Sequence, residues 1–447
     1  MQNSVLSRMA HKLTNPLVEF FRCPEWFADT ELRVRLNADD AATLARAWAH
    51  ELFWRERQHA WLSSSGFARL IDGLRFEHYE QAATDTTVGA IILREAYYLI
   101  RPLLGVTVRR HLQRLALGGW GKRSFPTWPV DRTVDHLHEI LLAAALRNKC
   151  VQQVPFIWFW PDGHRSCALL THDVETEAGL RFCPTLMDMD DAAGIKSAFQ
   201  IIPEQRYGAS GEELRRIRAR GFEINVHDLN HDGHLFRDHE SFRRRVAKIN
   251  EYGEKFGASG FRAGALYRNQ DWYEWLKFSY DMSVPNVAHL DPQHGGCCTI
   301  FPYFVGEILE LPVTAVQDYS LFHVLGTYSI DLWRTQIKEI MSHHGLVQII
   351  THPDYVIEER ARQTYKELLA YLGNLRATDG IWITQPADVN TWWRQRAKMK
   401  LVWTHDRWSI IGEGSEHATL AYAELDEGSL VYKQEDPFQI PCTLSIP

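Results

Sequence analysis

Apolar residues recur every three or four positions through the first 150 residues of the chain. The spacing is clearest over residues 41–54 and 136–148. Side chains three and four residues apart lie on the same face of an α-helix, so such spacing indicates amphipathic helices. We therefore predict a helical N-terminal region that covers residues 1–150.

From residue 151 onward the pattern changes, because short apolar runs now alternate with amphipathic stretches. The strand-like runs are 167–173, 197–203, 222–228, 260–264, 308–314, 346–353 and 380–386. Helical spacing separates several of them, at 241–257, 331–345 and 359–375. Alternating strands and helices predict an α/β domain with a mainly parallel sheet, open or closed into a barrel. We assign residues 151–398 to this domain.

The last segment has a third pattern. Short β-like runs are separated by Gly-containing turns at 412–414 and 426–428, and such turns are typical of small antiparallel sheets. Residues 399–447 are therefore expected to form a small β appendage.

Composition limits the classes of protein that the chain can belong to. The 447 residues carry a formal net charge of −7, which argues against wholesale nucleic-acid binding. The longest apolar runs, such as 140–146, fall far short of the roughly 20 residues that a membrane-spanning helix needs. The seven cysteines contain no CxxC pair, as expected for reduced thiols. No secretion signal is recognisable at the N-terminus, so we expect a cytoplasmic protein without a transmembrane segment.

One window of the chain is basic against this acidic background. Residues 96–130 contain no Asp or Glu and six basic residues: Arg101, Arg109, Arg110, Arg114, Lys122 and Arg123. Such a window can dock an anionic surface or phosphate groups. The alternative is a solvated face of an ordinary amphipathic helix.

Candidate chemistry gathers where the predicted strands end. Asp173 and Glu175 end the first strand, His227 ends the third, and His231 follows four residues later. Arg262 and His352 end two further strands. The carboxyl ends of parallel strands form the functional rim of α/β folds, so these side chains are expected to meet there.

The His227 and His231 pair suggests a metal site. If the chain turns helical after Val226, the two imidazoles share a face, and one carboxylate would complete a three-ligand site with a position left for water. Each residue also has a simpler reading. The pair can lie on the surface, Asp173 can cap a helix, Arg262 can form a surface ion pair, and His352 can make a hydrogen bond at the strand end. The combination at consecutive strand ends favours a metal hydrolase.

Residues 165–390 resemble the NodB-homology polysaccharide deacetylases, carbohydrate esterase family 4. The stretches that carry the resemblance are "LLTHDVE", "HDLNH", "FRAG" and "IITH". The resemblance implies an irregular (β/α) barrel of the glycoside hydrolase/deacetylase type, with fewer than eight complete units. The helical N-terminal region and the β appendage lie outside it.

The resemblance also implies a role for each matched residue. Asp173 would be the general base, His352 the general acid, and Arg262 the residue that orients the base through its planar guanidinium. Glu175, His227 and His231 would hold a divalent ion, with Zn²⁺ the expected metal. In the substrate pocket, the backbone N–H of Ala265 would bind the oxyanion and Ile350 would contact the acetyl methyl group.

The match has departures. The metal-binding carboxylate normally follows the base directly, but Val174 stands there and the next carboxylate is Glu175. Asp228 stands where the family has Ser or Thr, and Gly264 where it has Pro. The fourth family motif, an Asp-Trp pair, is not recognisable, and "YDMSVPN" (280–286) lies in its place.

The sequence therefore predicts a metal-dependent hydrolase that removes an N-acetyl or O-acetyl group from a carbohydrate or glycan precursor. One alternative is a hydrolase of a non-peptide C–N bond in a small non-sugar substrate. Another is a catalytically silent glycan-binding barrel, and a third is a glycan- or membrane-docking protein that uses the basic window.

Overall fold

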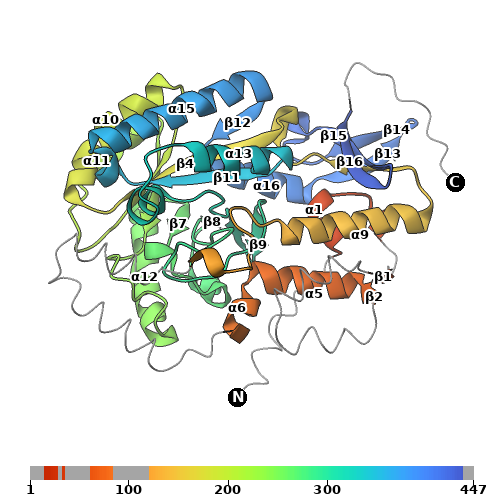
Figure 1. Cartoon of the computed structure of the whole chain (residues 1–447), viewed down its shortest axis with the longest axis horizontal. Helices are drawn as coiled ribbons and strands as arrows, with labels where there is room; N and C mark the ends of the chain where they lie inside the picture. Colours follow the sequence, from red (N-terminus) through yellow and green to blue (C-terminus); the bar gives the residue numbers. More distant parts are fainter. Residues whose placement is uncertain (1–14, 29–32, 36–60, 84–119, 436–447) are drawn as a thin grey trace. The chain divides into compact units, whose positions relative to one another are not determined.

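The structure, a computed structural model, describes residues 15–28, 33–35, 61–83 and 120–435 (Figure 1). The helix expected at 41–54 and most of the basic window lie outside these ranges. The chain forms two compact units. One comprises residues 1–75, 133–164 and 391–447, and the other comprises residues 76–132 and 165–390.

The second unit is built on a nine-stranded sheet in which eight strands are parallel. The parallel strands are β4 (Ser166–Val174), β5 (Ala198–Ile201), β6 (Glu223–His227), β7 (Gly260–Arg262), β8 (Tyr280–Asp281), β10 (Ile308–Glu310), β11 (Leu346–Thr351) and β12 (Ile381–Thr384). β9 (Tyr303–Val305) runs antiparallel to β10. Every strand expected in this part of the chain is present, whereas β8 and β9 were not expected.

Backbone hydrogen bonds close this sheet into an irregular barrel. The strand order runs β11–β4–β5–β6–β7–β8–β10. The segment that follows β10 then returns to β11, where the Ala315 N–H donates to the Gln348 carbonyl at 3.1 Å and the Gln348 N–H donates to Oγ1 of Thr314 at 2.8 Å. The expected (β/α) barrel is therefore confirmed.

Helices follow most of the strands and surround the barrel (Figure 1). They are α10 (Glu177–Ala192), α11 (Gly211–Ala219), α12 (His239–Phe256), α13 (Asp331–Ser342), α14 (Pro353–Val356) and α15 (Glu359–Asp379). The helix predicted at 241–257 is α12, which begins at the cap Asp238 and ends at Gly257. Its predicted apolar face, Phe242, Val246, Ile249 and Phe256, is buried. α6 (His78–Ala83) also belongs to this unit.

The first unit combines helices from the early chain with strands from the end of it. Its helices are α1 (Pro16–Phe21), α2 (Glu25–Ala28), α5 (Ser64–Arg75) and α9 (Thr133–Lys149). Its strands are β1 (Arg33–Arg35), β2 (Trp61–Ser63), β3 (Gln153–Ile157), β13 (Lys400–Thr404), β14 (Arg407–Ile411), β15 (Leu420–Asp426) and β16 (Ser429–Gln434). β15 pairs with β16 on one edge and with β3 on the other. This pairing joins the strands near the end of the chain to residues 153–157.

α16 (Pro386–Lys398) contains the boundary between the two units. Within the described ranges, no helix is long and apolar enough to cross a membrane.

Candidate active site

Four parallel strands place the predicted functional side chains at the carboxyl-terminal rim of the barrel. Asp173 is the penultimate residue of β4 and Glu175 follows that strand. His227 and Arg262 are the last residues of β6 and β7, and they face each other in the register of those strands. His352 follows β11 directly.

The loop that carries His231 is not helical, contrary to the expectation for the chain after Val226. Residues 228–231 form a bend in which Asp228 and His231 have positive φ angles of 56° and 53°. The left-handed conformation is costly for residues with a β-carbon but is tolerated by Asp and His at functional sites. His231 therefore approaches His227 through a tight loop, and the two rings lie edge to face with centroids 4.9 Å apart.

Glu175, His227 and His231 form a cluster that fits a divalent metal ion. One ligand atom from each residue lies within 4.8 Å of the other two. Ligand atoms around a tetrahedral zinc ion, each about 2.0–2.1 Å from it, stand roughly 3.3 Å apart, so small side-chain shifts would bring all three into range. Within the described chain, Nε2 of His227 is buried and makes no hydrogen bond, while the buried Nε2 of His231 faces Oε1 of Glu175. Buried polar atoms without partners are rare, and an ion is one explanation for them.

The protonation of His227 suits a ligand. Its Nδ1 lies 3.2 Å from the carbonyl oxygen of Arg262, which can only accept, so Nδ1 carries the proton and Nε2 keeps its lone pair. Burial is the main reason that the pKa of His227 falls to about 4. The imidazole is therefore neutral at physiological pH, as metal binding requires.

His231 and Glu175 face each other across the cluster. Nε2 of His231 lies 2.9 Å from Oε1 of Glu175. Burial alone would raise the pKa of Glu175, but the charge and hydrogen bonds of His231 and His352 outweigh it and hold this pKa well below its ordinary range. Glu175 is therefore ionised and directed at the same point as the two imidazoles.

Arg262 contacts Asp173 through one nitrogen of its guanidinium. Its Nη1 donates to Oδ1 of Asp173 at 2.6 Å, and the Arg262 side chain is fully buried. The rest of the guanidinium is already engaged: Nε donates to the Met282 carbonyl at 2.9 Å, Nη1 also donates to Oγ1 of Thr171 at 2.9 Å, and Nη2 faces the side-chain amide of Gln348. The barrel interior thus fixes Arg262, which in turn holds a single oxygen of Asp173.

Asp173 is ionised despite its burial. Burial raises its pKa, but the positive charge and hydrogen bond of Arg262, together with the charge of His352, outweigh burial, and the net pKa is below the ordinary value. Its free oxygen, Oδ2, lies 3.7 Å from Nε2 of His227. Asp173 therefore has one oxygen held by Arg262 and one directed toward the metal cluster.

His352 is held by Asp318, a residue that the sequence analysis did not identify. Oδ1 of Asp318 lies 2.6 Å from Nδ1 of His352, and Oδ2 accepts the backbone N–H of His352 at 2.7 Å. Burial lowers the pKa of His352, but Asp318 and Glu175 outweigh burial and raise it well above 6.5. Asp318 follows the apolar run 311–316, and its position after that run is the signal that would have identified it.

Ala265 lies in the turn after β7, and Ile350 is the penultimate residue of β11. Ala265 has a φ of 54° in the short turn after β7, and within the described chain its N–H has no hydrogen-bond acceptor. Ile350 is fully buried and clusters with Leu266 and Val313. An apolar patch therefore lies beside the turn that carries the free N–H.

Two departures from the deacetylase motifs, Gly264 and Asp228, are sterically complementary. A β-carbon at Gly264 would lie 2.5 Å from Oδ2 of Asp228 and 3.0 Å from Cδ2 of His231. Contacts under 3.0 Å force a shift, so a larger residue at 264 would displace either the Asp228 carboxylate or the His231 ring. Gly264 in place of Pro therefore makes room for Asp228 in place of Ser or Thr.

Comparisons with known proteins find similarity in solved structures alone. No family model matches the chain, and no curated protein matches it. A "putative polysaccharide deacetylase" from Mycobacterium smegmatis is 20% identical, with a TM-score of 0.43 over 53% of this chain and 93% of that one. Puue Allantoinase is 14% identical, with a TM-score of 0.43 over 53% of this chain and 92% of that one.

A "probable Polysaccharide deacetylase" from Pseudomonas aeruginosa PAO1 is also 14% identical, with a TM-score of 0.41 over 53% and 93% of the two chains. The matches thus include the family that the sequence motifs resemble. Because these TM-scores lie below 0.5, the functional proposal below rests on the geometry of the site itself.

Proposed function

We propose that the chain is a metal-dependent hydrolase that removes an acetyl group from an N-acetylated or O-acetylated carbohydrate. The observation that carries the proposal is the arrangement of an ionised Asp173, held by Arg262, beside the cluster of Glu175, His227 and His231. His352 adds a protonated imidazole beside Glu175, with Nε2 3.6 Å from Oε1.

Glu175, His227 and His231 would hold the divalent ion, for which Zn²⁺ is the best candidate because two imidazoles and one carboxylate are a common catalytic zinc set. Such an ion supplies an acidified water and polarises a carbonyl group. Oδ2 of Asp173 is the oxygen free to accept the proton of the attacking water, because Arg262 occupies Oδ1. The gain from Arg262 is orientation, since its charge makes Asp173 a weaker base.

The leaving group needs a proton, and His352 is the group to supply it. Asp318 keeps its Nδ1 engaged, so Nε2 is the donating atom. The N–H of Ala265 would stabilise the negative charge that develops on the carbonyl oxygen. Ile350, with Leu266 and Val313, would contact the acetyl methyl group.

The test is release of acetate by purified protein loaded with Zn²⁺, Co²⁺ or Mn²⁺. The substrates would be N-acetylated monosaccharides, oligosaccharides, nucleotide sugars and lipid-linked sugars, with 4-nitrophenyl acetate as a minimal acetyl ester. We expect turnover that a chelator abolishes and that added metal restores. Release that persists at full rate after verified metal removal would contradict the proposal, as would no release from any substrate by fully loaded protein.

A further inference from the structure

A recess lies on the rim of the barrel outside the metal cluster and borders the same loops. Its walls come from the loop after β7, the segment that closes the barrel, the loop after β8 and the loop before α9. The wall residues include Trp128, Leu266, Asp291, Val313 and Gln317. All five belong to the second unit.

Two wall residues connect the recess to the candidate active site. Leu266 and Val313 line the recess, and both also cluster with Ile350. Leu266 directly follows Ala265, while Gln317 directly precedes Asp318, which holds His352. A substrate positioned beside Ala265 and His352 would therefore have part of its surface facing this recess.

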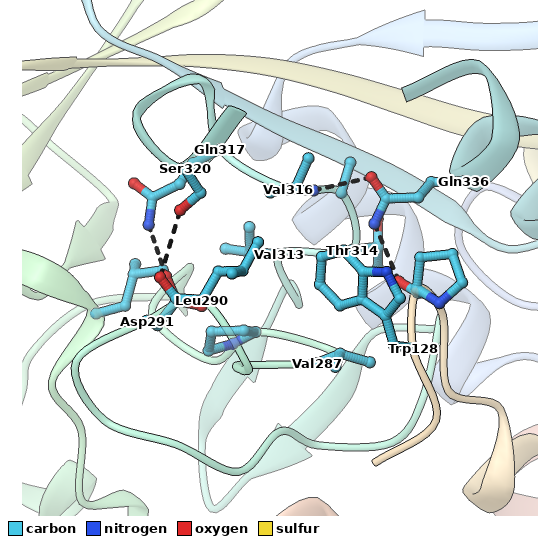
Figure 2. A pocket seen from close by; sticks show the side chains of 14 residues that line it. Trp128, Val287, Leu290, Asp291, Val313, Thr314, Val316, Gln317, Ser320 and Gln336 are labelled. Carbon is cyan, nitrogen blue, oxygen red and sulfur yellow. Dashed lines mark hydrogen bonds between the residues drawn. The ribbon is translucent and has the colours of Figure 1, made fainter. Parts of the chain in front are cut away.

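The recess has a polar end and an apolar remainder. Figure 2 shows Asp291 and Gln317 at one end, Trp128 and Gln336 at the other, and Val313 between them. Nε2 of Gln317 donates to Oδ1 of Asp291 at 2.7 Å. Within the described residues, Oδ2 of Asp291 has no hydrogen bond, and Asp291 as a whole is only 7% exposed.

A carboxylate in such surroundings is costly to bury without a cation or donors for both oxygens. Arg268 is near enough to offset part of the cost, yet burial still raises the pKa of Asp291 from 3.8 to about 6. The reaction proposed above makes no use of Asp291. A hydrogen-bond donor from a bound molecule, acting on Oδ2, would explain why the Asp291 carboxylate lies here.

The volume of the recess limits the chemical group that can supply this donor. The space open to the centre of a water-sized group measures about 20 Å³, and one water needs roughly 10–15 Å³ on this measure. The recess therefore admits a group of one or two heavy atoms rather than a whole sugar ring. The opposite wall is held in place, because Nε2 of Gln336 donates to the Pro129 carbonyl at 3.0 Å and Oε1 accepts the Val316 N–H at 3.1 Å.

We propose that this recess is a recognition subsite for one hydroxyl or hydroxymethyl group of the substrate, whose O–H donates to Oδ2 of Asp291. Trp128, Leu266 and Val313 contact the carbon that carries the hydroxyl. The subsite rests on the proposed function in that the occupant belongs to the acetylated carbohydrate. It selects among sugars by the presence and position of one hydroxyl.

Binding measurements test the subsite without relying on turnover. The protein is the full chain carrying Asp173→Asn, loaded with Zn²⁺. The probes are the methyl glycosides of N-acetylglucosamine, N-acetylgalactosamine and N-acetylmannosamine, each beside its 3-, 4- and 6-deoxy forms where that position is free. Affinities come from ligand-observed NMR titrations. A hydrogen bond to a charged group contributes about 1.5–3 kcal/mol, so we expect removal of one particular hydroxyl to weaken binding by roughly tenfold or more.

The decisive variant is Asp291→Ala in the same background. In it the preferred sugar and its deoxy form should bind equally, whereas Asp291→Asn, which keeps an acceptor oxygen, should retain part of the preference. Asp188→Ala removes a carboxylate whose side chain is 71% exposed and serves as the control, with the preference unchanged.

Three results overturn the subsite: a hydroxyl preference that survives in Asp291→Ala, no preference for any hydroxyl, or no binding of any of these sugars. A recess that merely holds a water molecule would give no preference for any hydroxyl or no binding of these sugars. Failure of the proposed function and failure of the subsite give different results. Protein that hydrolyses 4-nitrophenyl acetate but shows no Asp291-dependent preference keeps the active site and loses the subsite. Protein that shows the preference but releases no acetate from any substrate keeps the subsite and contradicts the proposed function.

Discussion

Two arcs of the barrel rim hold buried carboxyl groups at strand ends, and the groups differ in charge. On the arc of β4, β6 and β7, Asp173 is 4% exposed and has a lowered pKa. On the arc of β8 and β10, Glu310 is fully buried and has a pKa well above 4.5. Burial raises the pKa of both groups, so burial does not explain the difference.

The partners of the two carboxyl groups explain it. Asp173 faces the guanidinium of Arg262 and the protonated imidazole of His352, which stabilise its charged form. Glu310 faces the negative charge of Asp281 and shares a hydrogen bond with it, which stabilises the protonated form. An acid at a strand end is therefore a base only where the fold places cations beside it. The comparison shows that the fold keeps Asp173 ionised on one arc and Glu310 protonated on the other.

The largest contrast is expected between Asp173→Asn and Glu310→Gln. Loss of a general base usually costs about 10²–10⁴-fold in turnover, so Asp173→Asn should lose that much kcat and keep its metal. In Glu310→Gln the amide oxygen can still accept the Val284 N–H, as Oε1 does now at 2.9 Å, and the NH₂ group can replace the proton shared with Asp281. We therefore expect kcat within about threefold of the parent. Similar losses in both variants, measured by acetate release, would remove the distinction between the arcs.

Within the first arc, Asp173 and Glu175 are expected to differ in what they hold. A change to a partner of a metal ligand typically costs about 10–100-fold in metal affinity, so Glu175→Gln, a change of the ligand itself, should cost at least about 100-fold. Competition with a chromogenic zinc chelator measures this. If Asp173→Asn loses the metal and Glu175→Gln keeps it, the two roles are exchanged.

The steric fit between Gly264 and Asp228 predicts a smaller effect, on zinc binding, which a second substitution should reverse. A β-carbon at 264 would press on the Asp228 carboxylate and the His231 ring, and overpacking typically costs about 1–3 kcal/mol. Gly264→Ala should therefore weaken zinc binding by roughly tenfold or more. Adding Asp228→Ser, which shortens the opposing side chain, should restore most of it. Absence of rescue in the same chelator assay would show that the two positions are independent.

A further prediction concerns stability and pH in the second arc. Asp291 has a pKa of about 6 in the folded protein against 3.8 ordinarily, so folding disfavours its ionised form. Stability is therefore retained below about pH 4 and is lost as the pH rises toward 6. Each pKa unit corresponds to about 1.4 kcal/mol, which makes the penalty on the order of 3 kcal/mol at neutral pH.

Asp291→Asn removes that penalty and keeps an acceptor for Gln317. Urea unfolding at pH 7.5 should therefore show the variant to be more stable than the parent by up to about 3 kcal/mol, with no gain at pH 3.5. Asp188→Asn, at an exposed side chain, provides the matched control. A gain of equal size at both pH values would mean that charge is not its cause.

Much of this arrangement could be predicted from the sequence, because its signals are local. Apolar runs mark the strands, and a polar residue at the end of each run marks the rim, which is how Asp173, His227, Arg262 and His352 were found. The metal loop was predicted with the wrong backbone, since the spacing of His227 and His231 fits a helix as well as a tight bend. Only the positive φ angles at 228 and 231 decide between them.

What could not be predicted depends on contacts between distant segments. Asp318 reaches His352 because the segment after β10 returns to β11, and neither residue signals that pairing. The role of Gly264 appears only when Asp228, 36 positions earlier in the sequence, is placed against it. The grouping of β3 with β15 joins residues more than 260 positions apart. Charge state depends in the same way on which cations the fold brings near, so Glu310 and Asp173 look alike in the sequence.

A zinc titration tests the central claim most directly. The full chain, stripped of metal and dialysed against Zn²⁺, should bind one ion per chain by inductively coupled plasma mass spectrometry. His227→Ala should fall well below one, while His234→Ala, whose imidazole lies outside the cluster of Glu175, His227 and His231, should remain at one. One ion per chain in all three proteins would contradict the account, because the metal would then be held elsewhere and Asp173 would no longer stand beside it.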